Sequence, residues 1–466
     1  LTLGTSYTDL AGNSGPTQDT ANYEVDTREP TVSTIAISDE DGIQNNFLNP
    51  NDNVSFTVTF SETVIVDNSS GLSLTFLMGS ENRTAQYSSG SGNAQQVFGY
   101  TIDDLLTSGE NDSNGLSTGS DPIVLPSGST IKDLAGNSAI ITHAGMSTDS
   151  DYKVDTIPPT EEGAGITGAV GAQNNFLNAG DTVDVSVTFS EAVLDTSSGS
   201  LTLKIAVGSD NETATINSGS TTDNLTFRYT IQAGDNDTNG ISIDANDISG
   251  GTITDLAGNI ASDVTLEAVT DNSSYKVDTA APSVDNFTMS DTALKIGDNA
   301  TVTFVFSEQI CPVSSLCNNV VLTNGDITAP NGSLSTLATS DNTTWTGTFI
   351  PTDNVDLDDS NVLTLGTGYT DLAGNTGPAA TTANYEVDTR EPTVSSIAIT
   401  AQSGISSYNF LNPGDNVSFT VTFIEQVVVD NSSGLSLTIL MGSDNRTAQY
   451  SSGSGNAQQV FGYTID

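Results

Sequence analysis

The chain has 466 residues, with 58 Asp and Glu against 10 Lys and Arg, which gives a formal net charge of −48. A surface this acidic repels nucleic acid and anionic membranes, so we expect neither as a partner. Hydrophobic residues still make up 35% of the chain, which favours folded domains over disorder. No run of apolar residues is long enough for direct membrane insertion in this segment.

Two short motifs recur along the chain and divide it. DLAGN occurs at 9–13, 133–137, 255–259 and 371–375. Each copy is followed by VDT and a proline-containing linker, and the VDT motifs end at residues 27, 156, 279 and 389. We therefore expect the C-terminal part of one domain (1–27), three full domains (28–156, 157–279 and 280–389) and the N-terminal part of another (390–466). The three complete units are called the first, second and third full repeats below.

A longer repeat includes these units. LTLGTSYTDLAGNSGP at the start returns as LTLGTGYTDLAGNTGP from Leu363, and residues 390–466 repeat residues 28–103. The offset of 362 residues is the combined length of the three full repeats. We expect an interior piece of a longer tandem array, because both ends fall inside a repeat.

Apolar and polar residues alternate within each repeat. Val54, Phe56, Val58 and Phe60 face one side of a run, and 183–189 repeats the pattern. Turn-forming clusters such as NSSG and SSGSG separate these runs, and no stretch has a helical period. The pattern predicts an all-β fold of β-sandwich domains, with about seven to nine strands in each.

The first candidate cation site is a short acidic loop. Asp235, Asp237 and Asn239 alternate before Gly240, and the first full repeat has the equivalent set Glu110, Asp112 and Asn114. Oxygens at alternate positions of a tight turn converge on a hard cation such as Ca²⁺. A hairpin loop of ordinary turn formers accounts for the same residues.

The second candidate is the DLAGN turn. Asp133 and Asp255 open two of its copies, and each supplies an oxygen either to a cation at the domain end or to an Asx-type turn that caps a hairpin. We expect Leu134 to be buried between strands. Both roles of the aspartate stay open on the sequence alone.

The remaining candidates flank the linkers. Asp155 and Asp278 belong to VDT motifs at the exit of a last strand, as do Asp26 and Asp388. A glutamate closes the apolar run FTVTFSE and each of its equivalents, and these glutamates are Glu62, Glu191, Glu308 and Glu425. We expect each run to end at this glutamate, at the rim of the sandwich. Together these acids predict a calcium-binding cluster at each junction between domains, with several ions along the chain.

Enzymatic function is not expected. The sequence has no Ser-His-Asp set, no Cys-His pair, no phosphate-binding glycine loop and no zinc motif. A pair of carboxylates could serve a glycosidase, but sites repeated in every unit favour a structural role. Cys311 and Cys317 are spaced for a small-loop disulfide or are two thiols in a short loop.

The combination of DLAGN, VDT-linker-Pro, FSE and TWTGTFIPTDN resembles the bacterial Ig-like tandem repeats of giant surface proteins, such as the extender regions of RTX-type and biofilm-associated adhesins. The resemblance implies Ig-like β-sandwiches stacked end to end in an elongated rod, with calcium stiffening the junctions. It implies a calcium role for Asp133, Asp155, Asp278 and Glu191.

We therefore expect an extracellular or cell-surface stalk segment, whose partners are the neighbouring domains of the same chain. It would mediate surface projection, adhesion or biofilm cohesion. A self-assembling filament or sheath subunit, pairing with other copies of itself, is the alternative. An array of carbohydrate-binding modules ranks third, because aromatic residues make up only 6% of the chain.

Overall fold

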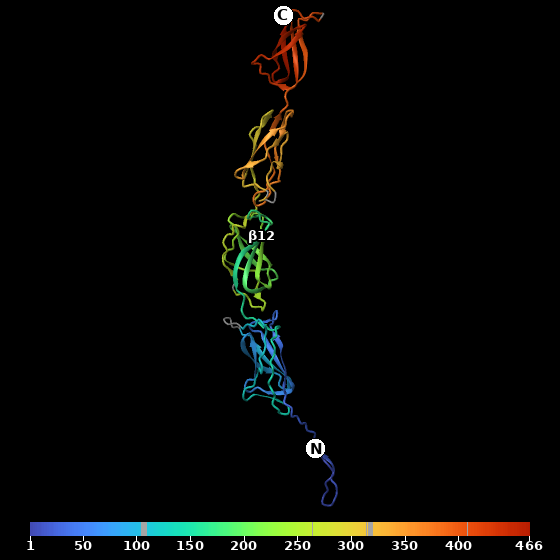
Figure 1. Ribbon diagram of the computed structural model, residues 1–466, viewed down its shortest axis with the longest axis vertical. Coiled ribbons are helices and arrows are strands. Elements are labelled where there is room, and N and C mark those ends of the chain that lie inside the picture. The colour runs from blue at the N-terminus through green and yellow to red at the C-terminus, as the bar shows by residue number, and fades with distance from the viewer. Residues whose placement is uncertain (104–109, 263, 314, 316–319, 408) are drawn as a thin grey trace. The chain divides into compact units, whose positions relative to one another are not determined.

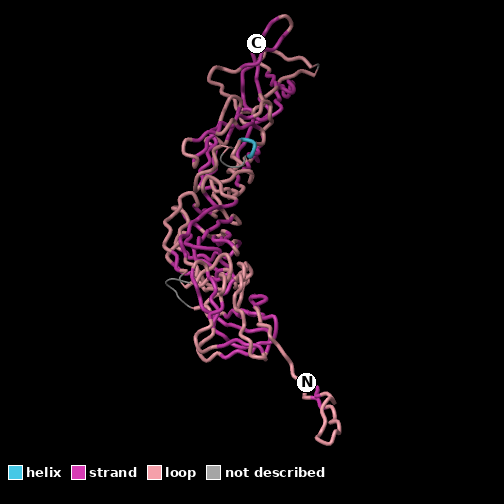
Figure 2. Tube along the Cα trace, turned by 60° about the horizontal axis from the view of Figure 1, so that its bottom comes forward, coloured by secondary structure: helices cyan, strands magenta, loops and turns pink. Residues whose placement is uncertain are grey.

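The structure is a computed structural model that describes residues 1–466 except 104–109, 263, 314, 316–319 and 408 (Figure 1). It divides into two compact units, Leu1–Thr279 and Ala280–Asp466, and each is described by itself. Figure 2 shows that strands and loops make up nearly all of the described trace, with one short helical turn, η1 (Asn324–Asp326). None of the described residues forms a helix long and apolar enough to cross a membrane. The predicted all-β fold of tandem β-sandwich domains is confirmed.

The alternating runs form the central strands. On β5 (Asn53–Asp67), Val54, Phe56 and Val58 are fully buried, while the residues between them are partly exposed. On β14 (Thr182–Asp195), Val183, Val185 and Val187 are buried in the same way. Successive side chains of a strand point to opposite faces, so every second apolar residue enters the core. This period is what the sequence predicted.

The first full repeat forms one curled sheet and one small parallel pair. Its remaining strands are β3 (Val32–Asp41), β4 (Phe47–Leu48), β6 (Ser73–Met78), β7 (Glu81–Ser89), β8 (Asn93–Thr101), β9 (Ile123–Val124), β10 (Thr130–Asp133) and β11 (Lys153–Val154). The sheet order is β10-β5-β8-β7-β6-β9, with β3 also on β5, and β4 pairs with β11 in parallel. Strand β11 therefore fixes the chain end of this repeat beside β4.

The second full repeat has a similar main sheet, together with a three-stranded sheet and a two-stranded pair (Figure 1, where β12 is labelled). Its remaining strands are β12 (Glu161–Val170), β13 (Phe176–Leu177), β15 (Thr202–Val207), β16 (Asp210–Ser218), β17 (Thr222–Thr230), β18 (Asn236–Asp237), β19 (Asn246–Asp247), β20 (Ile253–Asp255), β21 (Thr265–Leu266) and β22 (Lys276–Asp278). The main sheet has the order β12-β14-β17-β16-β15, with β20 on β14. The three-stranded sheet is β13-β22-β18, in which β13 pairs with β22 in parallel, and the pair is β19-β21.

The long strands β5 and β14 change partners partway along. The first part of β14 pairs with β12 and β17, and its end, Val193–Asp195, pairs with β20. The register with β17 shifts between Thr188 and Val193, which marks a β-bulge. Glu62 and Glu191 lie at this shift inside their strands, and Glu425 lies at the equivalent shift inside β35 (Asn416–Val427), so the expectation that the strand ends at the glutamate is wrong for these three residues. Glu308 follows the end of β25 (Ala300–Phe306). The bulge lets one strand serve two neighbours and brings the glutamate beside the DLAGN turn.

The second unit contains the third full repeat and residues 390–466. The strands of the third full repeat are β23 (Val284–Met289), β24 (Ala293–Lys295), β25 (Ala300–Phe306), β26 (Ile327–Thr328), β27 (Gly332–Leu334), β28 (Ala338–Thr339), β29 (Thr344–Pro351), β30 (Asp358–Asn361), β31 (Thr364–Leu365), β32 (Ala380–Thr381) and β33 (Tyr385–Asp388). Those after it are β34 (Val394–Ser403), β35 (Asn416–Val427), β36 (Ser436–Met441), β37 (Asp444–Ser452) and β38 (Asn456–Thr464), in the order β34-β35-β38-β37-β36. At the other end of the chain, β1 (Thr2–Leu3) pairs with β2 (Gln18–Asp19).

Each full repeat has its own hydrophobic core. The clusters run from Ile35 to Val154, from Leu177 to Val277 and from Phe287 to Val387. Aromatic rings anchor them: the Phe56 and Phe76 centroids are 4.8 Å apart, for example. Separate cores make each repeat a unit that buries its own apolar surface.

Core substitution in the second full repeat tests this packing. We expect Phe227→Ala to lower the free energy of unfolding of this repeat by about 3–5 kcal/mol, because Phe227 is fully buried and leaves a cavity. Thr226→Ala, on the opposite face of β17, should change it by less than about 1 kcal/mol. Denaturant unfolding measures both, and equal effects would contradict the assigned faces.

Candidate functional site

The DLAGN turn is closed by its own aspartate and asparagine. In the second full repeat, Asp255 Oδ1 accepts from the Asn259 main-chain N–H at 2.9 Å, and Oδ2 accepts from Asn259 Nδ2 at 2.6 Å. Asp133 and Asn137 make the same two contacts at 2.8 and 2.7 Å. The Asx-type interpretation of this motif is therefore correct. The contacts leave lone pairs on both carboxylate oxygens, so the turn role does not exclude a cation.

The expected burial of Leu134 is wrong. Its side chain is 77% exposed, because the turn projects from the end of the first full repeat and does not lie between strands. The equivalent Leu256 is partly buried. The surroundings of the turn therefore differ between the two repeats, although its internal hydrogen bonds do not.

Three acidic side chains meet at the linker between the first and second full repeats. Asp155, Glu191 and Asp255 each offer a carboxylate oxygen, and these oxygens lie within 4.8 Å of one another. Asp155 follows β11 at the end of the first full repeat, whereas Glu191 lies on β14 and Asp255 ends β20 in the second. The cluster therefore has members on both sides of the linker.

The same arrangement occurs one linker earlier. Asp26, Glu62 and Asp133 also bring carboxylate oxygens within 4.8 Å of one another. Asp26 comes from the VDT motif, Glu62 from β5 and Asp133 from the DLAGN turn. Recurrence at equivalent positions shows that the sequence motifs themselves build the cluster.

The VDT aspartate is held by main-chain contacts. Asp155 Oδ1 accepts from the Ile157 N–H at 3.1 Å, which turns the chain into the linker. Asn259 Nδ2 donates to the Asp155 main-chain oxygen at 3.0 Å, and Asn137 donates to the Asp26 main-chain oxygen at 3.2 Å. This second role of the DLAGN asparagine, which ties the turn directly to the preceding VDT, was not predicted from the sequence.

Electrostatics at the cluster favour a cation. Burial, together with the negative charges of Asp155 and Asp255, raises the pKa of Glu191 to about 7. Burial also raises the pKa of Asp255, although Asn259 opposes this shift. Three carboxylates are hard oxygen ligands of the type that Ca²⁺ prefers. Glu191 and Asp255 are disfavoured in their ionised forms here, and a divalent cation would reverse that preference.

The third junction falls between the two units. Asp278 ends β22 in the first unit, whereas Glu308 and the DLAGN residue Asp371 belong to the second. Asp371 accepts from Asn375 as Asp255 does from Asn259. These residues occupy the sequence positions of the clusters above, and their role as ligands stays a prediction.

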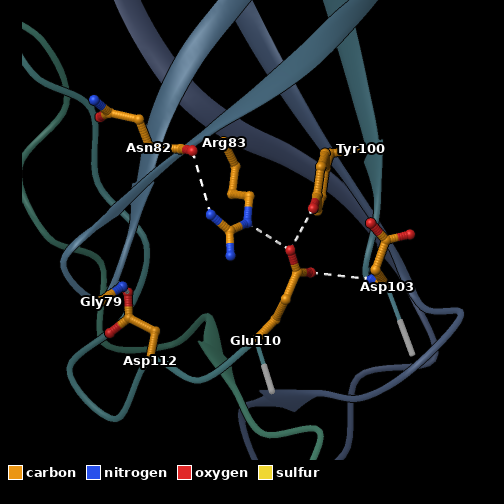
Figure 3. Close-up of polar contacts among 7 residues, drawn as sticks. All are labelled: Gly79, Asn82, Arg83, Tyr100, Asp103, Glu110 and Asp112. Atoms are coloured by element: carbon orange, nitrogen blue, oxygen red, sulfur yellow. Dashed lines mark hydrogen bonds and ion pairs between the residues drawn. The ribbon is translucent and has the colours of Figure 1, made fainter. Parts of the chain in front are cut away.

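The acidic loop of the first full repeat is held by protein donors. Glu110 Oε1 accepts from Arg83 Nε and from the Tyr100 hydroxyl, both at 2.6 Å, and Oε2 accepts from the Asp103 N–H at 3.0 Å (Figure 3). The Glu110 side chain is only 1% exposed. This buried ion pair joins the loop to β7 and β8.

The other carboxylates of these loops accept main-chain N–H groups. Asp112 accepts from Gly79, Asn114 and Gly115 at 2.7–3.0 Å, and Asp237 accepts from Gly208, Asn239 and Gly240 at 2.7–3.1 Å. Asp235 accepts from the Tyr229 hydroxyl at 2.7 Å, and Asn239 donates to Asp271 at 2.5 Å. These contacts account for the residues as turn and hairpin formers. Calcium at the loops stays a prediction.

The predicted disulfide falls on residues that are only partly described. Cys311 is fully buried, and Cys317 lies outside the described residues. The pairing of the two cysteines therefore stays a prediction.

A comparison with known protein families agrees with the fold. Residues 278–387 match the family described as bacterial Ig-like domain. No curated protein sequence matches the chain. Among solved structures, the chain is similar to a Ca²⁺-stabilised adhesin that helps an Antarctic bacterium reach out and bind ice. The two share 18% sequence identity with a TM-score of 0.34, over 94% of this chain and 91% of that chain. It is also similar to the Escherichia coli adhesin FdeC, at 11% identity and a TM-score of 0.22, over 66% of this chain and 89% of that one. Similarities this distant say nothing of what this chain binds.

The pKa of Glu191 predicts a pH dependence in buffer free of divalent cations. Its value in the folded state, about 7, lies above its ordinary value of 4.5, so the folded state binds this proton more tightly. Stability of the second full repeat should therefore fall as pH rises from about 5 to 7 and then level off. Thermal melting in EDTA across this range measures the effect.

Glu191→Gln should flatten this part of the profile, because the amide does not titrate. Glu162→Gln, an exposed acid on β12, is the matched control and should keep the wild-type slope. An unchanged slope in Glu191→Gln would show that Glu191 is not the titrating group.

Proposed function

We propose that this chain is a stalk or extender segment of an extracellular bacterial surface protein, in which Ca²⁺ at the repeat junctions ties consecutive Ig-like domains together. The cluster of Asp155, Glu191 and Asp255 is the observation that carries the proposal, because its members come from both sides of one linker. An ion held by all three would join the end of one repeat to the body of the next. The role is mechanical and not catalytic.

The linker supports this role. Residues 157–160 read IPPT, and two prolines limit the conformations of the linker in the absence of any ion. A bridging cation would restrict the linker further, since Glu191 and Asp255 are fixed by strands of the following repeat. Calcium would then add stiffness at each junction where it binds.

The charge of the chain supports an extracellular setting. With a formal net charge of −48, the chain repels itself, and bound cations offset this repulsion where acids crowd. Extracellular calcium modules work with dissociation constants of about 10⁻⁴–10⁻³ M, and three carboxylates suit that range. Such a stalk would project an adhesive part from the cell or contribute to biofilm cohesion, as in RTX-type and biofilm-associated adhesins.

Calcium should stabilise the chain through this cluster. We expect the melting temperature to rise on addition of Ca²⁺ and to return with EDTA, because a ligand bound only to the folded state adds about 2.7 kcal/mol at 100 times its dissociation constant. In the double variant Asp155→Asn with Glu191→Gln, the part of the calcium-induced rise in melting temperature that comes from this junction should be lost. Calorimetric melting with and without Ca²⁺ measures both.

Glu162→Gln is again the control, because it removes one exposed negative charge without touching the cluster. A calcium-induced shift of the same size in the double variant would overturn the proposed site. A wild type that does not respond to calcium would overturn the proposed mechanism.

A further inference from the structure

A second set of contacts crosses the same linker without any acidic group. Asn45 Nδ2 donates to the main-chain oxygen of Leu256 at 2.9 Å, and Asn49 Nδ2 donates to that of Ala257 at 2.8 Å. The two asparagines flank β4 in residues 44–49 of the first full repeat, a segment called the loop 44–49, and both acceptors lie in the DLAGN turn of the second. The loop thus satisfies two carbonyl groups that the turn presents outward.

Burial shows that this contact covers the turn. Ala257 is 1% exposed, whereas the equivalent Ala135, in the turn of the first full repeat, is exposed. A Cβ atom at Gly258 would lie 2.6 Å from Gln44 Nε2, while one at Gly136 would have no atom within 4 Å. The same five-residue turn is therefore buried by a partner in one repeat and open in the other.

The conformation of the loop 44–49 is fixed by hydrogen bonds within its own repeat. Gln44 and Phe47 exchange main-chain hydrogen bonds at 2.8 Å, and Asn45 has a positive φ of 50°, a conformation that Asn adopts more readily than most residues. The Asn49 N–H donates to Asp52 Oδ2 at 2.8 Å. A loop fixed in this way loses little conformational entropy when its amides bind.

Strand register identifies the equivalent loop of the third full repeat. Leu48 pairs with Val154 in the parallel pair β4–β11, and Leu294 pairs with Val387 in β24–β33. By this register Asp291 takes the place of Asn45, and Lys295 takes the place of Asn49. A carboxylate cannot donate a hydrogen bond, so the first donor is lost. The Lys295 ammonium is still a donor, but its Nζ lies 3.5 Å from Asp298 Oδ2, and the pair of amide donors is absent from this repeat. The second full repeat has Asn174 and Asn178 at the two positions.

We infer that the loop 44–49 is a docking surface for the DLAGN turn of the following repeat, and that its two asparagines lock the junction without a cation. A repeat with Asp and Lys at these positions lacks the lock, so its junction to the next repeat depends on the acidic cluster alone. The chain then carries both kinds of junction, locked where both positions are Asn and cation-dependent where they are Asp and Lys. The lock itself does not rest on calcium binding at the clusters, whereas the cation dependence of the unlocked junction rests on the proposed function.

Distance distributions between spin labels on the full chain test the lock. Labels are attached through unnatural amino acids at positions 89 and 218, which are equivalent exposed sites on β7 and β16. In excess EDTA the wild type should give one narrow distribution. Asn45→Asp with Asn49→Lys, which introduces the residues of the third full repeat, should lose this narrow peak.

A second variant distinguishes the effect of losing the two amide donors from the effect of the charges that Asp and Lys add. Asn45→Gly with Asn49→Ala removes both amides, adds no charge, and keeps a residue that tolerates positive φ at position 45. It should broaden the distribution as well. The reverse exchange, Asp291→Asn with Lys295→Asn, is the matched control and should leave the distribution between positions 89 and 218 unchanged.

Each outcome decides one claim. If both Asn45/Asn49 variants keep the narrow wild-type peak in EDTA while melting as the wild type does, the lock is overturned. If one of the two Asn45/Asn49 variants lowers the melting temperature of the first full repeat, the distance distribution of the other variant decides whether the lock exists. Addition of Ca²⁺ should narrow the broadened distributions again; failure of that step alone contradicts the proposed calcium function and leaves the lock intact.

Discussion

The junction depends on one physical constraint, the crowding of three carboxylates across a short linker. Asp155, Glu191 and Asp255 bring oxygens within 4.8 Å of one another, and burial with mutual repulsion raises the pKa of Glu191 to about 7. Like charges at this separation oppose the contact between repeats unless a proton or a cation neutralises them. The position of the strand bulge, the DLAGN turn and the VDT exit all serve to bring these acids together.

The DLAGN turn combines several functions in five residues. Its aspartate and asparagine close the turn, and the asparagine also reaches the main-chain oxygen of the preceding VDT motif. Its outward carbonyl groups receive Asn45 and Asn49 of the preceding repeat, and its glycine leaves room for Gln44. The motif is therefore a junction element, and its recurrence is explained by contacts that each copy can make with the repeat before it.

Much of this could be predicted from sequence, and the failures have physical reasons. Alternation at 54–60 predicted β5 because burial follows the two-residue period of a strand. The recurrence of acids in VDT, FSE and DLAGN indicated which residues the structure brings together. The exposure of Leu134 could not be predicted, because it depends on whether a neighbouring repeat covers the turn. The role of Asn45 and Asn49 could not be predicted, since their partners lie more than 200 residues away in the sequence.

A crystal structure of the chain grown with calcium, with anomalous scattering measured, tests the central claim most directly. We expect one ion among Asp155, Glu191 and Asp255, with carboxylate oxygens at about 2.3–2.6 Å from it, and a second ion among Asp26, Glu62 and Asp133. Anomalous density only at the 110–115 and 235–240 loops, or at neither junction, would contradict it.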